Sequence, residues 1–122
     1  MRLLLFHASP DRKELYRKAL SDFRADVVLC DESMENVPLA LLAGRSAAAL
    51  RGPAEEEFPP VSSIEEELLI IDQADRDHLG RALKAIRTKV PGSALKAMLT
   101  PTNAHWNARQ LYTQLVMERA LL

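Results

Sequence analysis

Cysteine and glycine are both scarce in this chain, and their scarcity excludes several kinds of site. The single cysteine, Cys30, rules out an internal disulfide and any zinc site built on several cysteine ligands. The four glycines form neither G-x-G-x-x-G nor G-x-x-x-x-G-K-[ST], so the two common backbone cradles for nucleotide phosphates are missing. The three histidines form no H-E-x-x-H or H-x-x-H. We therefore predict no metal, no cofactor and no catalytic residue, and favour a protein that is not an enzyme.

Long apolar runs are missing as well. The first run, residues 3–6, is far shorter than the roughly 7–15 apolar residues of a signal peptide or the roughly 20 of a membrane helix. One thiol without a disulfide framework fits a reducing compartment. The net charge of −1 argues against general attraction to nucleic acid or acidic lipid. We expect a cytoplasmic protein with neither nucleic acid nor membrane among its partners.

Four short apolar segments predict strands at residues 3–6, 27–30, 68–71 and 95–99. The first three are apolar at successive positions, which is typical of strands covered on both faces. Helix signals lie between and after the strands. Ser9-Pro10 and Thr100-Pro101 each place a capping residue before a proline at the first helical position. Residues 75–90 carry the best amphipathic stripe, and a weaker helical segment at 38–50 is interrupted by Gly44.

Strict alternation of strands and helices predicts one α/β domain over residues 1–122. Its sheet is expected to be small, four-stranded and mostly parallel, with helices on both faces. A weak internal repeat supports an alternative, since the strands at 3–6 and 68–71 each lead to an Asp-Arg helix start, at Asp11 and Asp75. The alternative is a ferredoxin-like sheet of two βαβ halves, with an inserted acidic segment and an extra C-terminal helix.

The segment from 31 to 67 carries nine acidic and two basic side chains. Three glutamates and Pro59-Pro60 within residues 52–63 indicate a mobile surface loop. The glutamate runs at 55–57 and 65–67 lack the spaced ligands and turn glycine of a calcium loop. Both runs are therefore predicted to be solvated rather than to bind a cation.

Polar residues follow each predicted strand. In a parallel sheet, Ser9, Asp31, Asp72 and Thr100 would share the edge where α/β sheets bind ligands. The last helix is expected to begin at Pro101, and no acid follows until Glu118, so its N-terminus would attract an anion. The residues predicted to bind a small anionic ligand there are Thr100, Thr102, Asn103 and His105. A purely structural interpretation, in which Thr100 caps the helix, stays open.

The last helix also suggests a partner surface. Its main apolar stripe comprises Ala104, Ala108, Leu111, Leu115 and Leu122. Trp106, Met117 and Leu121 fall on roughly the opposite side and predict a homodimer interface. Cover by the insert between the second and third strands is the competing explanation. The leading hypothesis is a non-enzymatic binding or regulatory protein that self-associates through this helix, and the alternative is a small-ligand or anion site at the sheet edge.

One segment carries a family resemblance. Residues 97–103 read Ala-Met-Leu-Thr-Pro-Thr-Asn, and Trp106, Leu111, Leu115 and Glu118-Arg119 follow. This pattern resembles the C-terminal half of an uncharacterised bacterial domain-of-unknown-function family, in which a strand ends in a Leu-Thr-Pro-x-Asn-like turn before a helix with a tryptophan and a late glutamate. The resemblance covers the second half of the chain well and the first half only loosely. It implies a small bacterial protein and brings no established activity.

Overall fold

The computed structural model describes residues 1–45, 62–72, 74–92 and 94–121. The elements in chain order are β1 (Arg2–Phe6), α1 (Pro10–Ala19), β2 (Asp26–Cys30), α2 (Leu39–Leu42), β3 (Leu68–Asp72), α3 (Arg76–Lys89), β4 (Leu95–Met98) and α4 (Ala108–Ala120). The four predicted strands are confirmed, with ends that differ by one residue. Most of the predicted mobile loop, residues 52–61, lies outside the described residues, as do Gln73 and Leu122.

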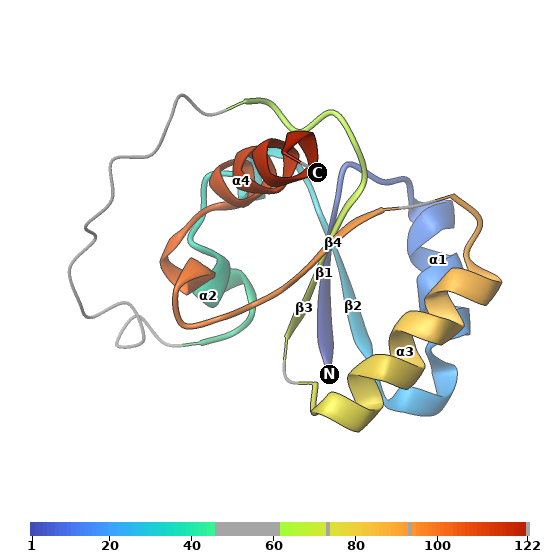
Figure 1. Cartoon of the computed structure of the whole chain (residues 1–122). Helices are drawn as coiled ribbons and strands as arrows, with labels where there is room; N and C mark the ends of the chain where they lie inside the picture. The colour runs from blue at the N-terminus through green and yellow to red at the C-terminus, as the bar shows by residue number, and fades with distance from the viewer. Residues whose placement is uncertain (46–61, 73, 93, 122) are drawn as a thin grey trace.

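The sheet has the strand order β2-β1-β3-β4. β1 is parallel to β2 and β3 is parallel to β4, whereas the central pair β1 and β3 is antiparallel. The expected α/β fold with a mostly parallel sheet is therefore confirmed. The chain contains two βαβ units of the kind expected in the ferredoxin-like alternative, β1-α1-β2 and β3-α3-β4. They join through the central pair, and their helices α1 and α3 lie on the same side of the sheet (Figure 1).

The expectation that four polar strand ends share one sheet edge is wrong. Since β3 runs against β1, Ser9 and Asp31 follow strands that end at one edge, while Asp72 and Thr100 lie at the other. The reason is physical: β3 is buried at every position and apolar at its first four, and such a run has no pattern that reports its direction. A single cleft shared by all four strand ends is accordingly not formed.

Helices cover both faces of the sheet, as predicted. Because successive side chains of a strand point to opposite faces, Leu3 and Leu5 pack with α1 and α3, while Leu4 and Phe6 pack with α2 and the first half of α4. Figure 1 shows α1 and α3 together on one side of the strands and α2 and α4 on the other.

Two of the predicted helix starts are confirmed. The Ser9 side chain accepts a hydrogen bond from the backbone N–H of Arg12, with Pro10 in the first turn of α1. The Asp75 side chain accepts one from the N–H of His78 and caps α3. Such caps satisfy N–H groups that have no partner inside the helix, which is why they can be identified from local sequence.

The predicted start of the last helix is wrong. α4 begins at Ala108 and is capped by Asn107. The Asn107 side chain accepts from the N–H of Gln110, and the Gln110 side chain accepts from the N–H of Asn107, which is a complete capping box. The preceding segment forms a turn and the short 3-10 helix η4 (Asn103–His105). The buried Ala104 therefore belongs to η4 and not to α4.

The second helix is short. α2 spans four residues and is followed by Gly44, which has a φ of 85°. A Cβ at Gly44 would collide with the guanidinium of Arg2, which donates a hydrogen bond of 2.7 Å to the carbonyl of Ala43. The predicted interruption at Gly44 is thus confirmed, and residues 46–50 of the predicted helix lie outside the described residues.

Glu67 anchors α1 to the sheet. Its carboxylate accepts hydrogen bonds of 2.8 and 2.7 Å from Arg12 and one of 2.8 Å from the hydroxyl of Tyr16. Burial opposes ionisation of Glu67, but the bonds from Arg12 and Tyr16 outweigh it and lower the pKa of Glu67 below its ordinary value. Burial and the bond to Glu67 raise the pKa of Tyr16.

Glu66 makes the equivalent contacts on the other face. Arg119 of α4 donates two hydrogen bonds to it, of 2.9 and 2.8 Å, and the hydroxyl of Tyr112 donates one of 3.0 Å. Hydrogen bonds from Arg119 and Tyr112 lower the pKa of Glu66 to about 2. The prediction of a solvated 65–67 run is therefore wrong for Glu67, whereas Glu66 stays partly solvated within its ion pair. The two glutamates reach different helices because neighbouring side chains before a strand point to opposite faces.

We predict that alanine substitutions at Glu65, Glu66 and Glu67 lower the free energy of unfolding by increasing amounts in that order. Glu67→Ala should lower the free energy of unfolding by about 2 kcal/mol, because it leaves the buried hydroxyl of Tyr16 and the guanidinium of Arg12 without their shared acceptor. Glu66→Ala should cost less, since the Glu66–Arg119 pair is about half exposed. The exposed Glu65 supplies the matched control. Urea unfolding measures the series, and an equal loss at Glu65 and Glu67 would contradict it.

Candidate functional site

A polar pocket of about 250 Å³ lies where the parallel strands β1 and β2 end side by side. Ligands of α/β proteins bind in the crevice outside such carboxyl ends. The pocket is lined by His7, Ala8, Cys30, Asp31, Glu32, Glu35, Ser63, Ile64 and Arg109. Of the four strand-end residues expected at one edge, Asp31 lines the pocket, whereas Ser9 caps α1 beside it, and segments from later in the chain complete the site.

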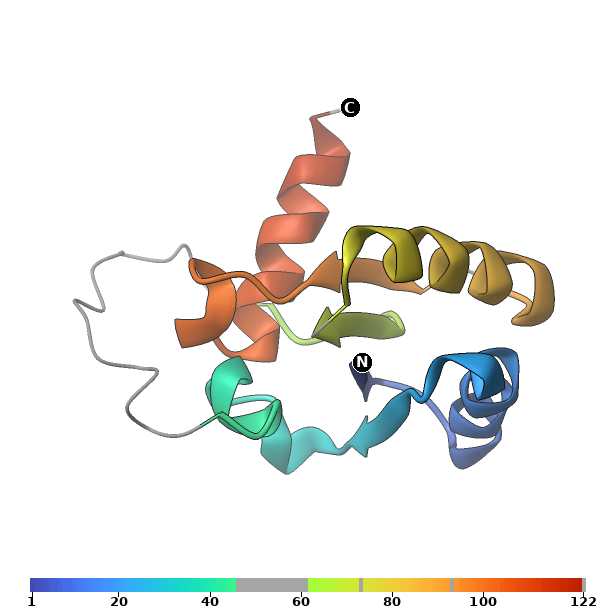
Figure 2. The ribbon, with the colours of Figure 1, turned by 90° about the horizontal axis from the view of Figure 1, so that it is seen from below.

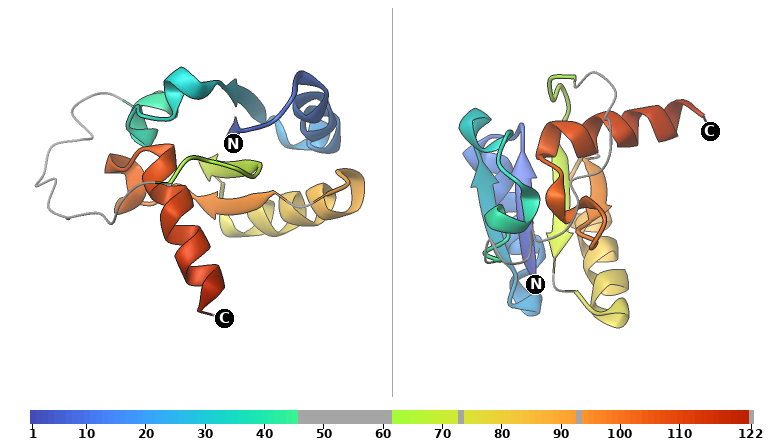
Figure 3. Two further views of the ribbon diagram at one scale, coloured as in Figure 1. Left: turned by 90° about the horizontal axis from the view of Figure 1, so that it is seen from above. Right: turned by 90° about the vertical axis from the view of Figure 1, so that its left-hand side faces the viewer.

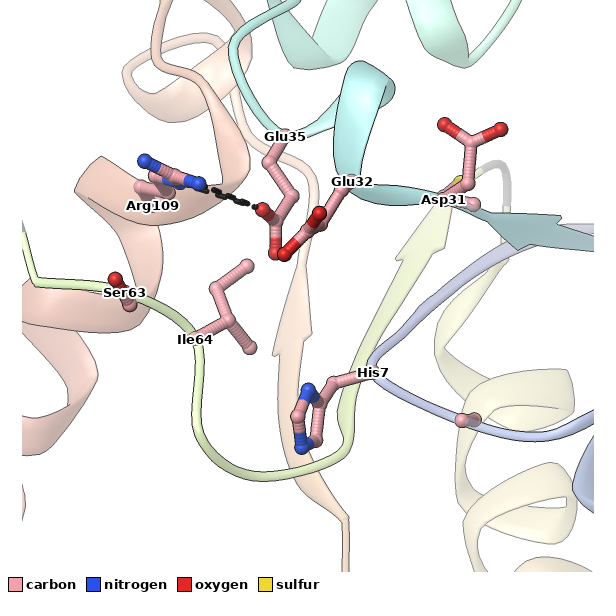
Figure 4. A pocket seen from close by; sticks show the side chains of 9 residues that line it. His7, Asp31, Glu32, Glu35, Ser63, Ile64 and Arg109 are labelled. Carbon is pink, nitrogen blue, oxygen red and sulfur yellow. Dashed lines mark hydrogen bonds and ion pairs between the residues drawn. The ribbon is translucent and has the colours of Figure 1, made fainter.

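The centre of the pocket wall is an ion pair between Glu35 and Arg109 (Figure 4). Glu35 is only 6% exposed, and its Oε2 accepts hydrogen bonds of 3.0 and 3.3 Å from Arg109. Asp31 positions Glu35, because it caps the short 3-10 helix η2 (Glu32–Met34) that leads to Glu35. Arg109 comes from the first turn of α4. The pair therefore ties the end of β2 to α4.

His7 lies across the pocket from Glu32 and Glu35 (Figure 4). Its φ of 55° lies in the left-handed region, which few residues other than glycine adopt. This conformation turns the chain from the buried Phe6 into the cap of α1 and leaves the imidazole exposed. Backbone conformations of this kind are concentrated at functional sites, and here one places a group that can both donate and accept hydrogen bonds.

Cys30 contributes no nucleophile to the pocket. Burial raises the pKa of its thiol to about 11. The thiol form therefore predominates at neutral pH, and the reactive form of cysteine is the thiolate. Cys30 acts as a small apolar side chain in the core on the α4 side of the sheet.

The charges around the pocket favour a ligand that is not an anion. Three carboxylates, of Asp31, Glu32 and Glu35, line it against the single guanidinium of Arg109, which Glu35 already holds. Within the described ranges, no three His, Cys, Asp or Glu side chains are grouped so that they could hold a metal ion. The pocket thus suits a small molecule with a positive charge or several hydrogen-bond donors.

The residues predicted to bind an anion lie together in one turn, at the opposite edge of the sheet. The donors in this turn are largely used within it: Thr100 N–H donates to Asn103 Oδ1 at 2.8 Å, and Asn103 N–H donates to Thr100 Oγ1 at 3.1 Å. Asn103, 8% exposed, also donates from its side chain to the carbonyl of Met98. Thr102 is exposed and His105 is half-buried. The free helix N-terminus on which the prediction rested is not formed, and anion binding here stays a prediction.

The predicted interface residues separate into two groups. Met117, 47% exposed, lies on the outer half of α4, and Leu121, 86% exposed, caps its C-terminal end. This part of α4 extends away from the sheet (Figures 2 and 3). Trp106 precedes α4 in an extended conformation and packs, half-buried, against the core. Its expected helical alignment with Met117 is therefore not formed.

Comparison with known proteins adds one match. Residues 67–122 match a family model, that of the domain of unknown function DUF3783. The match spans β3, α3, β4 and α4, which is the second βαβ half with the C-terminal helix. This finding supports the resemblance to an uncharacterised family and attaches no activity to it. Searches among curated proteins and solved structures find no match.

Sequence reasoning missed Glu35 and Arg109. They are separated by 74 positions in the chain, so no local spacing connects them. Asp31 was identified as a strand end, but its role as the cap that positions Glu35 depends on the fold.

None of the helices in the described ranges has the length and apolar character needed to cross a bilayer.

We predict that Arg109→Met destabilises the fold by about 3 kcal/mol, because it leaves the carboxylate of Glu35 buried without a cation. Adding Glu35→Met should recover part of the loss, since two apolar side chains can replace a buried ion pair. A double-mutant cycle by urea unfolding measures this coupling. Additive losses from the two substitutions would mean that the pair has no energetic role.

Proposed function

We propose that the protein is a small binding protein, without catalytic activity of its own, that self-associates through the outer half of α4. A cytoplasmic location and a bacterial origin belong to the same proposal, on the grounds of the lone thiol and the resemblance of the second half of the chain. The observation that supports self-association best is the exposure of Met117 and Leu121 on one side of a helix that extends beyond the sheet.

The free energy available from covering these side chains is substantial. Full burial of a large apolar side chain is worth roughly 1.5–3 kcal/mol, and Leu121 has almost none of its surface covered. Met117 lies four residues earlier, so both project from the same side of α4. Met117 also lines a hollow of about 230 Å³, together with Ser62, Ser63, Glu65, Tyr112, Thr113 and Val116.

This arrangement is self-complementary, as a symmetric dimer requires. In an antiparallel pair of α4 helices centred on Met117, each Met117 meets its counterpart. Leu121 lies four residues after Met117, and Thr113 lies four residues before it. In the antiparallel pair, Leu121 of each helix therefore faces the turn of the other helix that contains Thr113. The hollow beside Thr113 and Met117 is in the right place to receive it. The same surface therefore carries both the projecting Leu121 and the hollow that would receive Leu121 of the other copy.

Self-association predicts a change in mass for one methionine substitution and not for another. Met117→Glu should convert a wild-type dimer into a folded monomer, because it would place two carboxylates at the centre of the interface. Met98→Glu is the matched control, since Met98 is 38% exposed and lies on β4 rather than on α4. Light scattering gives the masses, and circular dichroism shows that each variant is folded.

The alternative outcomes have distinct signatures. Cover of Met117 by the insert between β2 and β3 would make Met117→Glu less stable at an unchanged mass. A wild-type chain that is monomeric at high micromolar concentration would contradict self-association outright.

A second candidate function is binding of a small ligand in the pocket at the ends of β1 and β2. The observation that favours it is the meeting of His7, Glu32 and the buried Glu35 around one cavity. Its acidic lining supports a cationic ligand, whereas the turn with Thr100, Thr102, Asn103 and His105 was predicted to bind an anion.

We expect NMR titrations to distinguish these two ligand sites. A small diamine should shift the amides of His7, Asp31 and Glu32, because carboxylates dominate the pocket. Inorganic phosphate should shift the amides of Thr102, Asn103 and Ala104 if the anion prediction holds. Glu32→Gln should weaken the diamine response and leave any phosphate response unchanged. A diamine response spread over all exposed acids would contradict the pocket as a site.

A further inference from the structure

A second cavity, of about 370 Å³, lies between α3 and β4, and no candidate function above uses it. Its volume falls within the roughly 300–1,000 Å³ of typical small-molecule sites and exceeds that of the pocket at β1 and β2. It is lined by Leu83, Ile86, Arg87, Val90, Pro91, Gly92 and Lys96.

The floor of this cavity is apolar because α3 lies over the edge of the sheet. Ile86 and Val90 are buried against the core on the α1 and α3 side, and Leu83 packs partly against it. β4 pairs with β3 along one edge, and in the described part of the chain no strand covers its other edge. Leu83 presents its exposed part to the cavity, and Ile86 and Val90, 2% and 4% exposed, each contribute a narrow strip of surface beneath it.

The rim of the cavity is cationic. Arg87 is exposed on α3, Lys96 is half-buried on β4, and no carboxylate is among the described residues that line the cavity. Lys96 Nζ donates to the carbonyl of Ala94 at 3.3 Å, a long bond that occupies one of its three donors.

One carboxylate acts on Lys96 from nearby. The charge of Lys96 contributes to lowering the pKa of Glu67, after the larger effects of burial, Arg12 and Tyr16. Glu67 is already held at short distance by Arg12, which also donates to the carbonyl of Pro91 beside the cavity. Glu67 is thus held mainly by Arg12, and no carboxylate among the described lining residues offsets Arg87 and Lys96, so the rim keeps a net positive charge.

We propose that this cavity binds an amphiphilic anion, a molecule with a hydrocarbon chain or ring and one carboxylate, phosphate or sulfonate group. The apolar part lies against Leu83, Ile86 and Val90, and the anionic group lies between Arg87 and Lys96. An apolar floor with a few convergent polar groups is the usual composition of a small-molecule site, with the polar groups fixing the orientation. Charge also separates this cavity from the acidic pocket at β1 and β2.

Octanoate and decanoate are suitable probes, titrated into isotope-labelled full-length protein. Saturable shifts should appear at the amides of Arg87, Gly92 and Lys96. Decanoate should bind more tightly than octanoate, by up to about fourfold for each added methylene that becomes buried. Decanol has the hydrocarbon chain without a charge, and inorganic phosphate has the charge without a hydrocarbon chain. Both should bind at least tenfold more weakly than decanoate.

Arg87→Gln and Lys96→Gln should each weaken decanoate binding by about tenfold, which corresponds to one lost charge-assisted contact. The matched controls are Arg76→Gln and Lys84→Gln, which remove exposed cations of α3 that do not line the cavity and should leave binding unchanged. Arg87 is exposed, so its variant should fold even if Lys96→Gln does not.

Equal weakening by all four substitutions would overturn the proposal, because it would indicate general charge attraction. Decanol binding as tightly as decanoate, or phosphate doing so, would overturn it as well. An absence of saturable shifts at the lining residues up to millimolar decanoate would do the same.

Discussion

The antiparallel pairing of β1 with β3 determines where every polar strand end of this protein lies. Five residue pairs form it, from Arg2 with Asp72 to Phe6 with Leu68, and Leu4 faces Ile70 at the centre. A two-fold relation between the βαβ halves follows from this register. It sends the carboxyl ends of β1 and β2 to one edge and those of β3 and β4 to the other. The candidate pocket therefore forms at the ends of β1 and β2 alone, and Asp72 instead pairs with Arg45 at the opposite edge.

The same pairing explains how the segment before β3 comes to connect three parts of the fold. Because Phe6 pairs with Leu68, Glu67 lies beside the turn that leads into α1, within reach of Arg12 and Tyr16. Slightly earlier in the chain, Ser63 and Ile64 complete the pocket. Had β3 run parallel to β1, this segment would lie at the other edge, and α1 and α4 would both lose their carboxylate anchors.

Local sequence predicted what depends on local energetics. The strands follow from apolar runs, and the starts of α1 and α3 follow from the caps at Ser9 and Asp75, whose hydrogen bonds close within three residues. The start of α4 was mistaken because two capping signals compete there. Thr100 and Asn103 close a turn on themselves, and the reciprocal bonds of Asn107 and Gln110 start the helix.

Features that depend on distant contacts were not predictable in this way. The direction of β3 has no signature in its run of four apolar residues, although the repeated Asp-Arg helix starts did indicate two equivalent halves. Glu66 and Glu67 belong to a run that resembles a solvated loop in sequence, and only the alternation of faces assigns them to α4 and α1. Glu35 and Arg109 meet solely because the end of β2 and the first turn of α4 lie at one edge of the sheet.

The exposure of Met117 and Leu121 follows from how α4 is held rather than from fraying of its end. An isolated helix of 13 residues is marginal in water, so contacts must hold the part beyond the sheet. Tyr112 and Arg119, about two turns apart on one side of α4, both bind Glu66. Arg119 is exposed, but its two hydrogen bonds to Glu66 tie the last turn of α4 to the segment before β3. Met117 and Leu121 project from another side, so the contacts that fix α4 also present its apolar surface outward in one defined orientation.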